Sequence, residues 1–254
     1  MFDWNAFTLF LYIVMRMSGF FLFHPVFART GIPSTFRAGL VGLMSINVLL
    51  ANGGGAEVPE TVFALGLRLF MELLIGYVLS TIMRFFLYIA EQGGEIVDTQ
   101  MGMSMARNYD PTTNSSSTVM ANILNLLMLV LFVIANGHIT LLRMILTSGE
   151  IVPFGAVAVS PNAMLRCLEL FTECALLALK LALPVLGAEL MGQVGMGILM
   201  KVIPQINVFA INIELKVIIG LAMMSLMLSP MSEFLLEAEN YMLRSMREVL
   251  GLMQ

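Results

Sequence analysis

The chain has 254 residues, of which 59% are hydrophobic and only 12% are charged, and its mean hydropathy is +0.90. Soluble domains average about 45–50% apolar and about 25% charged residues, so this composition predicts an integral membrane protein. The net charge is −4 and no run of five or more basic residues occurs. These features argue against a nucleic-acid partner, because phosphate binding needs several closely placed Lys or Arg side chains.

Three long hydrophobic segments occupy the first part of the chain. A membrane-spanning helix needs about 20 mostly apolar residues, and the sequence predicts helices at residues 6–23, 36–50 and 60–90. The first is expected to end at His24-Pro25, because a residue that precedes proline is pushed out of the helical region. The third is long enough to exceed the bilayer or to tilt strongly.

The rest of the chain predicts helices at 119–135, 162–186 and 208–228, followed by an amphipathic terminal helix at 232–251. The first of these could continue past Gly137, and the second could pass through Pro184 with a kink. No hydrophilic block is long enough to fold separately. We therefore predict an all-α integral membrane protein with five to six long, kinked hydrophobic helices, folded as a single domain over residues 1–254.

Charged residues lie in or beside these segments, although an ionised group near the bilayer centre costs about 2.5–3.5 kcal/mol. Arg68 with Glu72 and Arg166 with Glu169 are spaced for ion pairs along one helix. The others need partners from other helices, a water-filled cavity or other subunits, and a proton relay is the alternative to charge pairing within an assembly. The full set is Arg16, Arg68, Glu72, Arg84, Glu169, Glu173, Lys180, Glu189, Glu214 and Lys216.

Catalytic signals are weak. The stretch from Gly102 to Ala106 approaches the G-x-S-x-G motif, but it ends in alanine and does not join a predicted strand to a helix. His24 and His138 lack the spacing of metal ligands. The sequence therefore predicts no enzymatic activity, no cofactor and no bound metal.

Four patches of the sequence resemble the export-gate family of flagellar FliR and injectisome SctT proteins. In chain order they are PVFARTGIPSTFRAGL, GGEIVDTQMGMSMARNYDP, LLMLVLFVIANGHITLL and GILMKVIPQINVFAINIELKVIIGL, and the similarity covers nearly the whole chain. The resemblance implies a non-enzymatic, multi-pass subunit of a type III protein export gate in the bacterial inner membrane, within the flagellar basal body. The flagellar system is preferred from overall similarity.

The resemblance also implies partners and an architecture. FliP-like and FliQ-like subunits would form a helical assembly with this chain, beside FlhB-like and FlhA-like export components, and unfolded protein substrates would pass through it. Residues 1–160 would correspond roughly to a FliP-like part and residues 161–254 to a FliQ-like helical hairpin. Charges buried in the membrane helices would then face other subunits.

In this family the segment after the third long helix is believed to enter the central pore as a plug. Methionine is unbranched and carries a polarizable sulfur, so a methionine cluster can deform and still exclude ions. The alternative is that these methionines fill gaps in the protein core. The candidate plug residues are Gln100, Met101, Gly102, Met103, Ser104, Met105, Arg107, Asp110 and Pro111.

A second set of positions combines polar side chains with helix-breaking residues, and we predict a role in assembly. Glu95 and Asp98 could pair with Arg107 or with a neighbouring chain, or they could belong to a solvated loop. The others are interpreted as helix interruptions packed against partners, with direct substrate contact as the alternative for the last three. The set is Glu95, Asp98, Asn136, Gly137, His138, Pro204, Gln205 and Asn207.

A small-solute secondary transporter remains the alternative function, since transporters also contain broken helices and intramembrane charges. The two hypotheses differ in their dependence on other chains. A gate subunit should require its sister proteins, whereas a transporter should be stable and active alone or as a homo-oligomer.

Overall fold

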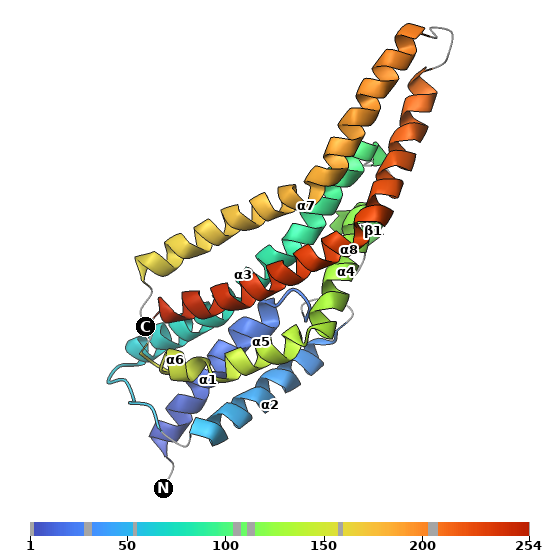
Figure 1. The fold of residues 1–254 in the computed structure, drawn as a ribbon. Coiled ribbons are helices and arrows are strands. Elements are labelled where there is room, and N and C mark those ends of the chain that lie inside the picture. The colour runs from blue at the N-terminus through green and yellow to red at the C-terminus, as the bar shows by residue number, and fades with distance from the viewer. Residues whose placement is uncertain are drawn as a thin grey trace. The chain divides into compact units, whose positions relative to one another are not determined.

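The computed structural model describes residues 3–27, 32–52, 55–103, 108–110, 115–156, 160–202 and 208–253. Most of these residues are helical (Figure 1), which confirms the predicted all-α class. The helices are α1 (Trp4–Phe23), α2 (Ser34–Asn52), α3 (Val62–Met101), α4 (Val119–Ile134), α5 (Gly137–Leu146), α6 (Ser148–Ile151), α7 (Pro161–Val202) and α8 (Val208–Gly251).

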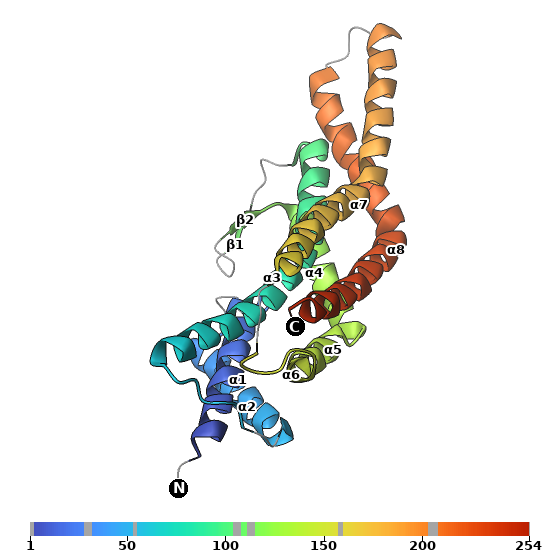
Figure 2. The same cartoon turned by 90° about the vertical axis from the view of Figure 1, so that its left-hand side faces the viewer.

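A short antiparallel hairpin lies between α3 and α4 in the chain (Figure 2). It consists of β1 (Asn108–Asp110) and β2 (Ser115–Ser117), with Tyr109 opposite Ser116. The sequence does not predict these two strands.

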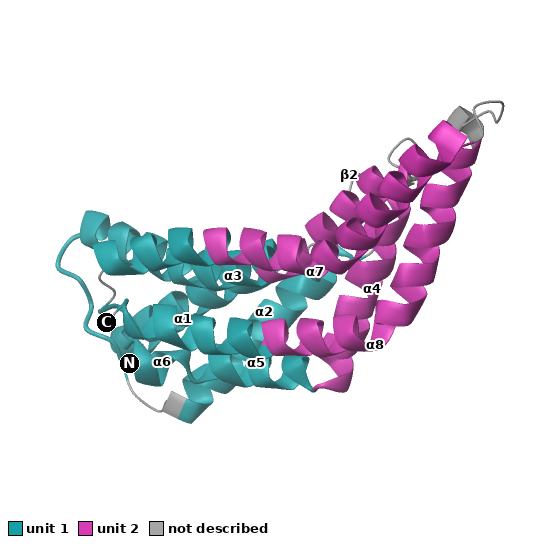
Figure 3. Ribbon diagram, turned by 45° about the horizontal axis from the view of Figure 1, so that its top comes forward, with its two compact units in different colours: residues 1–85, 136–171, 240–254 teal, residues 86–135, 172–239 magenta. Residues whose placement is uncertain are grey.

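The chain divides into two compact units (Figure 3). Unit 1 contains residues 1–85, 136–171 and 240–254, and unit 2 contains residues 86–135 and 172–239. The long helices α3, α7 and α8 each contribute to both units.

In the described part of the chain, five helices are long and apolar enough to cross a membrane: α1, α2, α3, α7 and α8. The broken pair α4 and α5 makes a sixth if it counts as one span. Helices α3, α7 and α8 have 40, 42 and 44 residues, which corresponds to about 60 Å or more at 1.5 Å per residue. Because a bilayer core is about 30 Å thick, each of these helices is about twice as long as a crossing requires.

Both ends of α1 follow from local chemistry. The Asp3 carboxylate caps the start by accepting hydrogen bonds from the backbone N–H groups of Asn5 and Ala6, at 3.0 and 3.3 Å. The helix ends where predicted, with His24 extended (φ −65°, ψ 127°) before Pro25. Burial lowers the pKa of His24 to about 3, and its Nδ1 accepts a hydrogen bond from the Val26 N–H at 3.2 Å. The imidazole is thus neutral at physiological pH.

Several predicted helix ends were wrong. The helix expected to stop at residue 90 continues to Met101, the one expected to stop at 186 passes through Pro184 to Val202, and the last passes through Pro230 to Gly251 without a separate terminal helix. Helices that cross a membrane tolerate proline and glycine, because neighbouring groups satisfy the freed backbone atoms and water does not compete for them. Proline and glycine are therefore poor predictors of where the helices of this chain end.

Within unit 1, α1 and α3 touch through their backbones. A Cβ atom added to Gly76 would overlap the Arg16 carbonyl oxygen and lie 2.6 Å from the Phe20 nitrogen, and one added to Gly19 would overlap the Leu73 carbonyl oxygen. Small residues at such a crossing let helices approach closely in a membrane. Glycine is required at these two positions because no larger residue fits.

We expect Gly76→Ala to lower the stability of the protein by about 1–3 kcal/mol, the usual cost of forcing extra volume into a packed core. Gly66→Ala is the matched control, because it makes the same change on the same helix where no described atom lies within 4 Å of the added methyl group. Thermal unfolding of the detergent-purified protein measures both, and equal unfolding temperatures for the two variants would contradict the close crossing.

Candidate functional site

A fully buried ion pair joins α1 to α3 in unit 1. Arg16 Nε lies 2.6 Å from Glu72 Oε2, and both side chains are 0% exposed. Arg16 Nη1 also donates to Ser148 Oγ at 3.2 Å and to the Val152 carbonyl oxygen at 3.0 Å. The second carboxylate oxygen, Glu72 Oε1, accepts the Gly155 N–H at 2.7 Å. The pair therefore attaches the segment around α6 to both α1 and α3.

Aromatic rings complete this polar centre. The Phe154 ring lies over the Arg16 guanidinium, with the central carbon 4.2 Å from the ring centroid, a cation–π arrangement. Gly155 has φ +84° and packs under Tyr12, where a Cβ atom would lie 2.7 Å from the ring. Both the backbone angle and this contact favour glycine. The charges are thus excluded from solvent on several sides.

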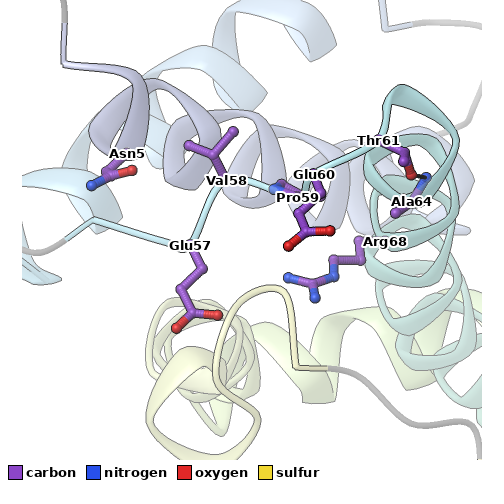
Figure 4. A pocket seen from close by; sticks show the side chains of 8 residues that line it. All are labelled: Asn5, Glu57, Val58, Pro59, Glu60, Thr61, Ala64 and Arg68. Carbon is purple, nitrogen blue, oxygen red and sulfur yellow. Dashed lines mark hydrogen bonds between the residues drawn. The ribbon is translucent and has the colours of Figure 1, made fainter.

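The predicted pairing of Arg68 with Glu72 was wrong. Glu72 faces Arg16, whereas Arg68 lines a separate cavity of about 670 Å³ with Glu57 and Glu60. In Figure 4 the Glu60 carboxylate lies toward the Arg68 guanidinium. Helical spacing identifies only partners on the same helix, so it could not find a partner 56 residues away.

The predicted pairing of Arg166 with Glu169 is confirmed, at 3.3 Å. Arg166 also contacts the Glu248 carboxylate at 3.2 Å and donates to the Tyr241 hydroxyl at 3.1 Å. Glu169 is 64% exposed, and such an exposed pair adds little stability by itself. Tyr241 and Glu248, on α8, were not anticipated because they are distant in sequence.

In unit 2 a second buried acid lies where α3 meets α4. Asp98 is 0% exposed, and its Oδ2 accepts the Met120 N–H at 2.7 Å. Glu95, one turn earlier, accepts a hydrogen bond from Gln92 Nε2 at 3.2 Å. Both acids are part of helix α3, and not part of a solvated loop. Arg107, the partner suggested by the sequence, lies outside the described residues.

Met101 is the last residue of α3 and is fully buried. Its side chain packs against Gly220 of α8, where a Cβ atom would lie 2.6 Å from the Met101 sulfur. Gly102 follows with φ +76°, the left-handed conformation in which glycine often ends helices. Gln100 and Met103 are half-buried. Met101 thus fills space between helices, and a role for the segment in a pore remains a prediction.

The remaining candidate positions are only partly described. Asp110 lies in β1. The helical conformation is interrupted after α4 at Asn136, which has φ 58°. The carbonyl oxygen of Asn136 accepts hydrogen bonds from the N–H groups of Ile139 and Thr140. Gly137 begins α5, and His138 is half-buried. Ser104, Met105, Arg107, Pro111, Pro204, Gln205 and Asn207 lie outside the described residues.

The long helices expose both apolar and charged side chains. On α7 and α8 of unit 2, Met191, Val194 and Leu226 are more than half exposed, and Lys180 and Glu214 are exposed as well. Among the described residues, no group of three or more His, Cys, Asp or Glu is arranged to hold a metal ion. These helices therefore present a large surface that suits contact with other chains or lipid.

Comparison with known proteins identifies a family. The profile of the family described as "Bacterial export proteins, family 1" matches residues 7–240. The chain is 28% identical to the flagellar biosynthetic protein FliR of Escherichia coli (strain K12), over 89% of this chain and 87% of the relative. It is 24% identical to FliR of Bacillus subtilis (strain 168), over 98% and 96%. It is also 25% identical to the surface presentation of antigens protein SpaR of Shigella sonnei, over 82% and 80%.

We expect Arg16→Met and Glu72→Leu each to destabilise the protein by about 3–5 kcal/mol, because each leaves one buried charge without its partner. The double variant should recover part of this loss, since an apolar pair of similar volume is often tolerated. Arg68→Met is the control and should change little. Purified yield and unfolding temperature measure all four proteins, and a double variant no better than the worse single variant would contradict this expectation.

Proposed function

Because the chain belongs to the family of bacterial export proteins, family 1, we propose that it is a non-enzymatic subunit of the flagellar type III protein export gate in the bacterial inner membrane, at the basal body. With FliP-like and FliQ-like subunits, and beside FlhB-like and FlhA-like components, it forms the pore through which unfolded flagellar proteins cross. The flagellar system is preferred because the two FliR relatives align with more of the chain than SpaR does.

This proposal rests on one observation: charged side chains are exposed on α7 and α8, two helices that are longer and more exposed than the helices of a bundle that folds alone. Lys180 and Glu214 are exposed on α7 and α8, and a charge facing lipid near the bilayer centre costs about 2.5–3.5 kcal/mol. Neighbouring subunits or pore water would relieve that cost. The same subunits would cover the apolar side chains beside these charges. This supports an assembly subunit over a transporter that works alone.

The segment from Gly102 to Thr118 is proposed to close the pore at rest. It leaves α3 directly after the buried Met101 and re-enters the fold at α4, so its two ends are held in the protein. Met103 and Met105 provide flexible apolar side chains that can seal against ions and then separate for a chain of variable sequence. The closing element is therefore a loop on a packed helical base.

We expect replacement of residues 104–117 by a short Gly-Ser link to make proteoliposomes that contain the assembled gate leak ions, while the intact gate stays tight. This deletion spares Met101 and the base of the loop. A Gly-Ser segment of the original length is the matched control. It restores the length of the loop without its side chains, and we expect it to leak as well because the methionine seal is lost.

Ion flux from loaded liposomes gives the measurement, with assembly checked by co-purification of the FliP-like and FliQ-like subunits. Tight liposomes from a normally assembled deletion variant would mean that closure resides in other subunits.

A further inference from the structure

We propose that one face of α3 in unit 1 binds a phospholipid whose headgroup carries both a phosphate and a primary amine. One acyl chain lies in an apolar groove between α3 and α7, and the headgroup lies in the polar cavity at the start of α3. Every residue that lines the groove or the cavity belongs to unit 1. The inference is independent of the proposed function.

The apolar groove is a cavity of about 410 Å³ between α3 and the beginning of α7. Met71, Leu74 and Val78 line it from α3, and Met164 and Leu168 line it from α7. Its other lining side chains are likewise hydrocarbon or sulfur-containing, and none is charged. Met164 and Leu168 are 63% and 65% exposed, so the groove opens at the protein surface. Such walls have no group that orients a polar ligand, and they suit a hydrocarbon chain.

The size of the groove favours a single acyl chain over a helix of another protein. A helix with its side chains is about 10 Å wide, so one turn of about 5.4 Å already occupies about 420 Å³. A stable protein interface buries about 800 Å² per partner, which requires several turns. The lining positions of α3 run from Met71 to Phe85, about 21 Å along the helix axis, and one leaflet contributes about 15 Å of hydrocarbon. The groove therefore accepts one acyl chain along its length.

The polar cavity presents charges of both signs (Figure 4). Arg68, Glu57 and Glu60 line its volume of about 670 Å³, and none of these three side chains makes an ion pair or hydrogen bond with another described residue. A guanidinium group binds phosphate through paired N–H groups, and a carboxylate accepts the N–H groups of an ammonium ion. A headgroup with only a phosphate would leave both carboxylates unpaired. The charges therefore fit a zwitterionic headgroup with a primary amine.

Both cavities lie along one face of α3. Ala64 and Arg68 line the polar cavity, and Met71, Ile75 and Val78 line the apolar groove. Steps of three and four residues place all five positions on the same side of a helix, and Arg68 precedes Met71 by about 4.5 Å along the axis. This order from charged to apolar matches the order of headgroup and acyl chain in a phospholipid. A free anion would not use the groove, and a hydrocarbon without a headgroup would not use the charges.

A photoreactive phosphatidylethanolamine with a diazirine in its acyl chain tests the site. The probe is added to phosphatidylglycerol proteoliposomes that contain the full chain with its copurified subunits, and adducts are mapped by mass spectrometry. We expect adducts on residues 69–84 and 167–180, the tryptic segments that line the groove. Replacement of some phosphatidylglycerol by unlabelled phosphatidylethanolamine, at about ten times the amount of probe, should lower these adducts about tenfold at a saturated site. A probe that only samples bulk lipid would keep its adduct yield.

Arg68→Met should lower the adducts about threefold, the effect of losing one partly exposed charge contact. Arg143→Met is the matched control, because it makes the same change at an exposed arginine of unit 1 that lines neither cavity, and it should keep the wild-type yield of adducts. If Arg68→Met does not assemble, Glu60→Gln removes a carboxylate that faces the amine and should lower the adducts in the same way.

Three results would overturn the proposal. Absence of adducts on both segments, with the probe attached elsewhere on the complex, would mean that another subunit covers the groove. Adducts that phosphatidylethanolamine does not displace would mean that the groove holds lipid of any headgroup. Adducts that are displaced but keep their yield in Arg68→Met, or in Glu60→Gln where that variant replaces it, would place the headgroup outside the polar cavity.

Discussion

The buried pair between Arg16 and Glu72 is the contact on which unit 1 depends. Two charges removed from water are tolerated only when their hydrogen-bonding capacity is largely met, and here Ser148, Val152 and Gly155 supply the additional partners. The glycines at the α1–α3 crossing stand one turn from these charges, Gly19 after Arg16 and Gly76 after Glu72. Because the backbones of α1 and α3 touch at these glycines, the Arg16 and Glu72 side chains lie close enough to form the ion pair.

The same arrangement, a glycine and an acidic residue four positions apart, recurs further along α3. Glu72 and Gly76 are four residues apart and contact α1, and Gly94 and Asp98 are four residues apart and contact α4. In each case glycine allows the approach, and the acid satisfies a polar group of the neighbouring helix. An apolar helix gains little specificity from hydrophobic contact in a membrane, where lipid is equally apolar. Paired glycines and acids therefore determine which helix α3 meets and at which turn.

Composition and hydrophobic run length were sufficient to predict the all-α membrane class and the approximate helix positions, and His24-Pro25 marked the end of α1. The ion pair within one helix, Arg166 with Glu169, was also predictable from spacing. Partners distant in sequence were not, and Glu72 was assigned to the wrong arginine for that reason. The extent of α3 was missed because its apolar run ends near Ala90, whereas Gly93, Gly94 and Asp98 continue the helix and contact its neighbours. The burial of Met101 depends on α8, which no local pattern reveals.

We propose that sister proteins cover the exposed apolar and charged helices of this chain in the assembled gate. Native mass spectrometry tests it directly, on the tagged chain extracted from membranes of cells that also produce FliP-like and FliQ-like proteins. We expect one particle that contains this chain together with both kinds of sister subunit, and a lower yield of the chain when it is produced alone. A stable monomer or homo-oligomer that excludes the sister proteins and transports a small solute would contradict the claim.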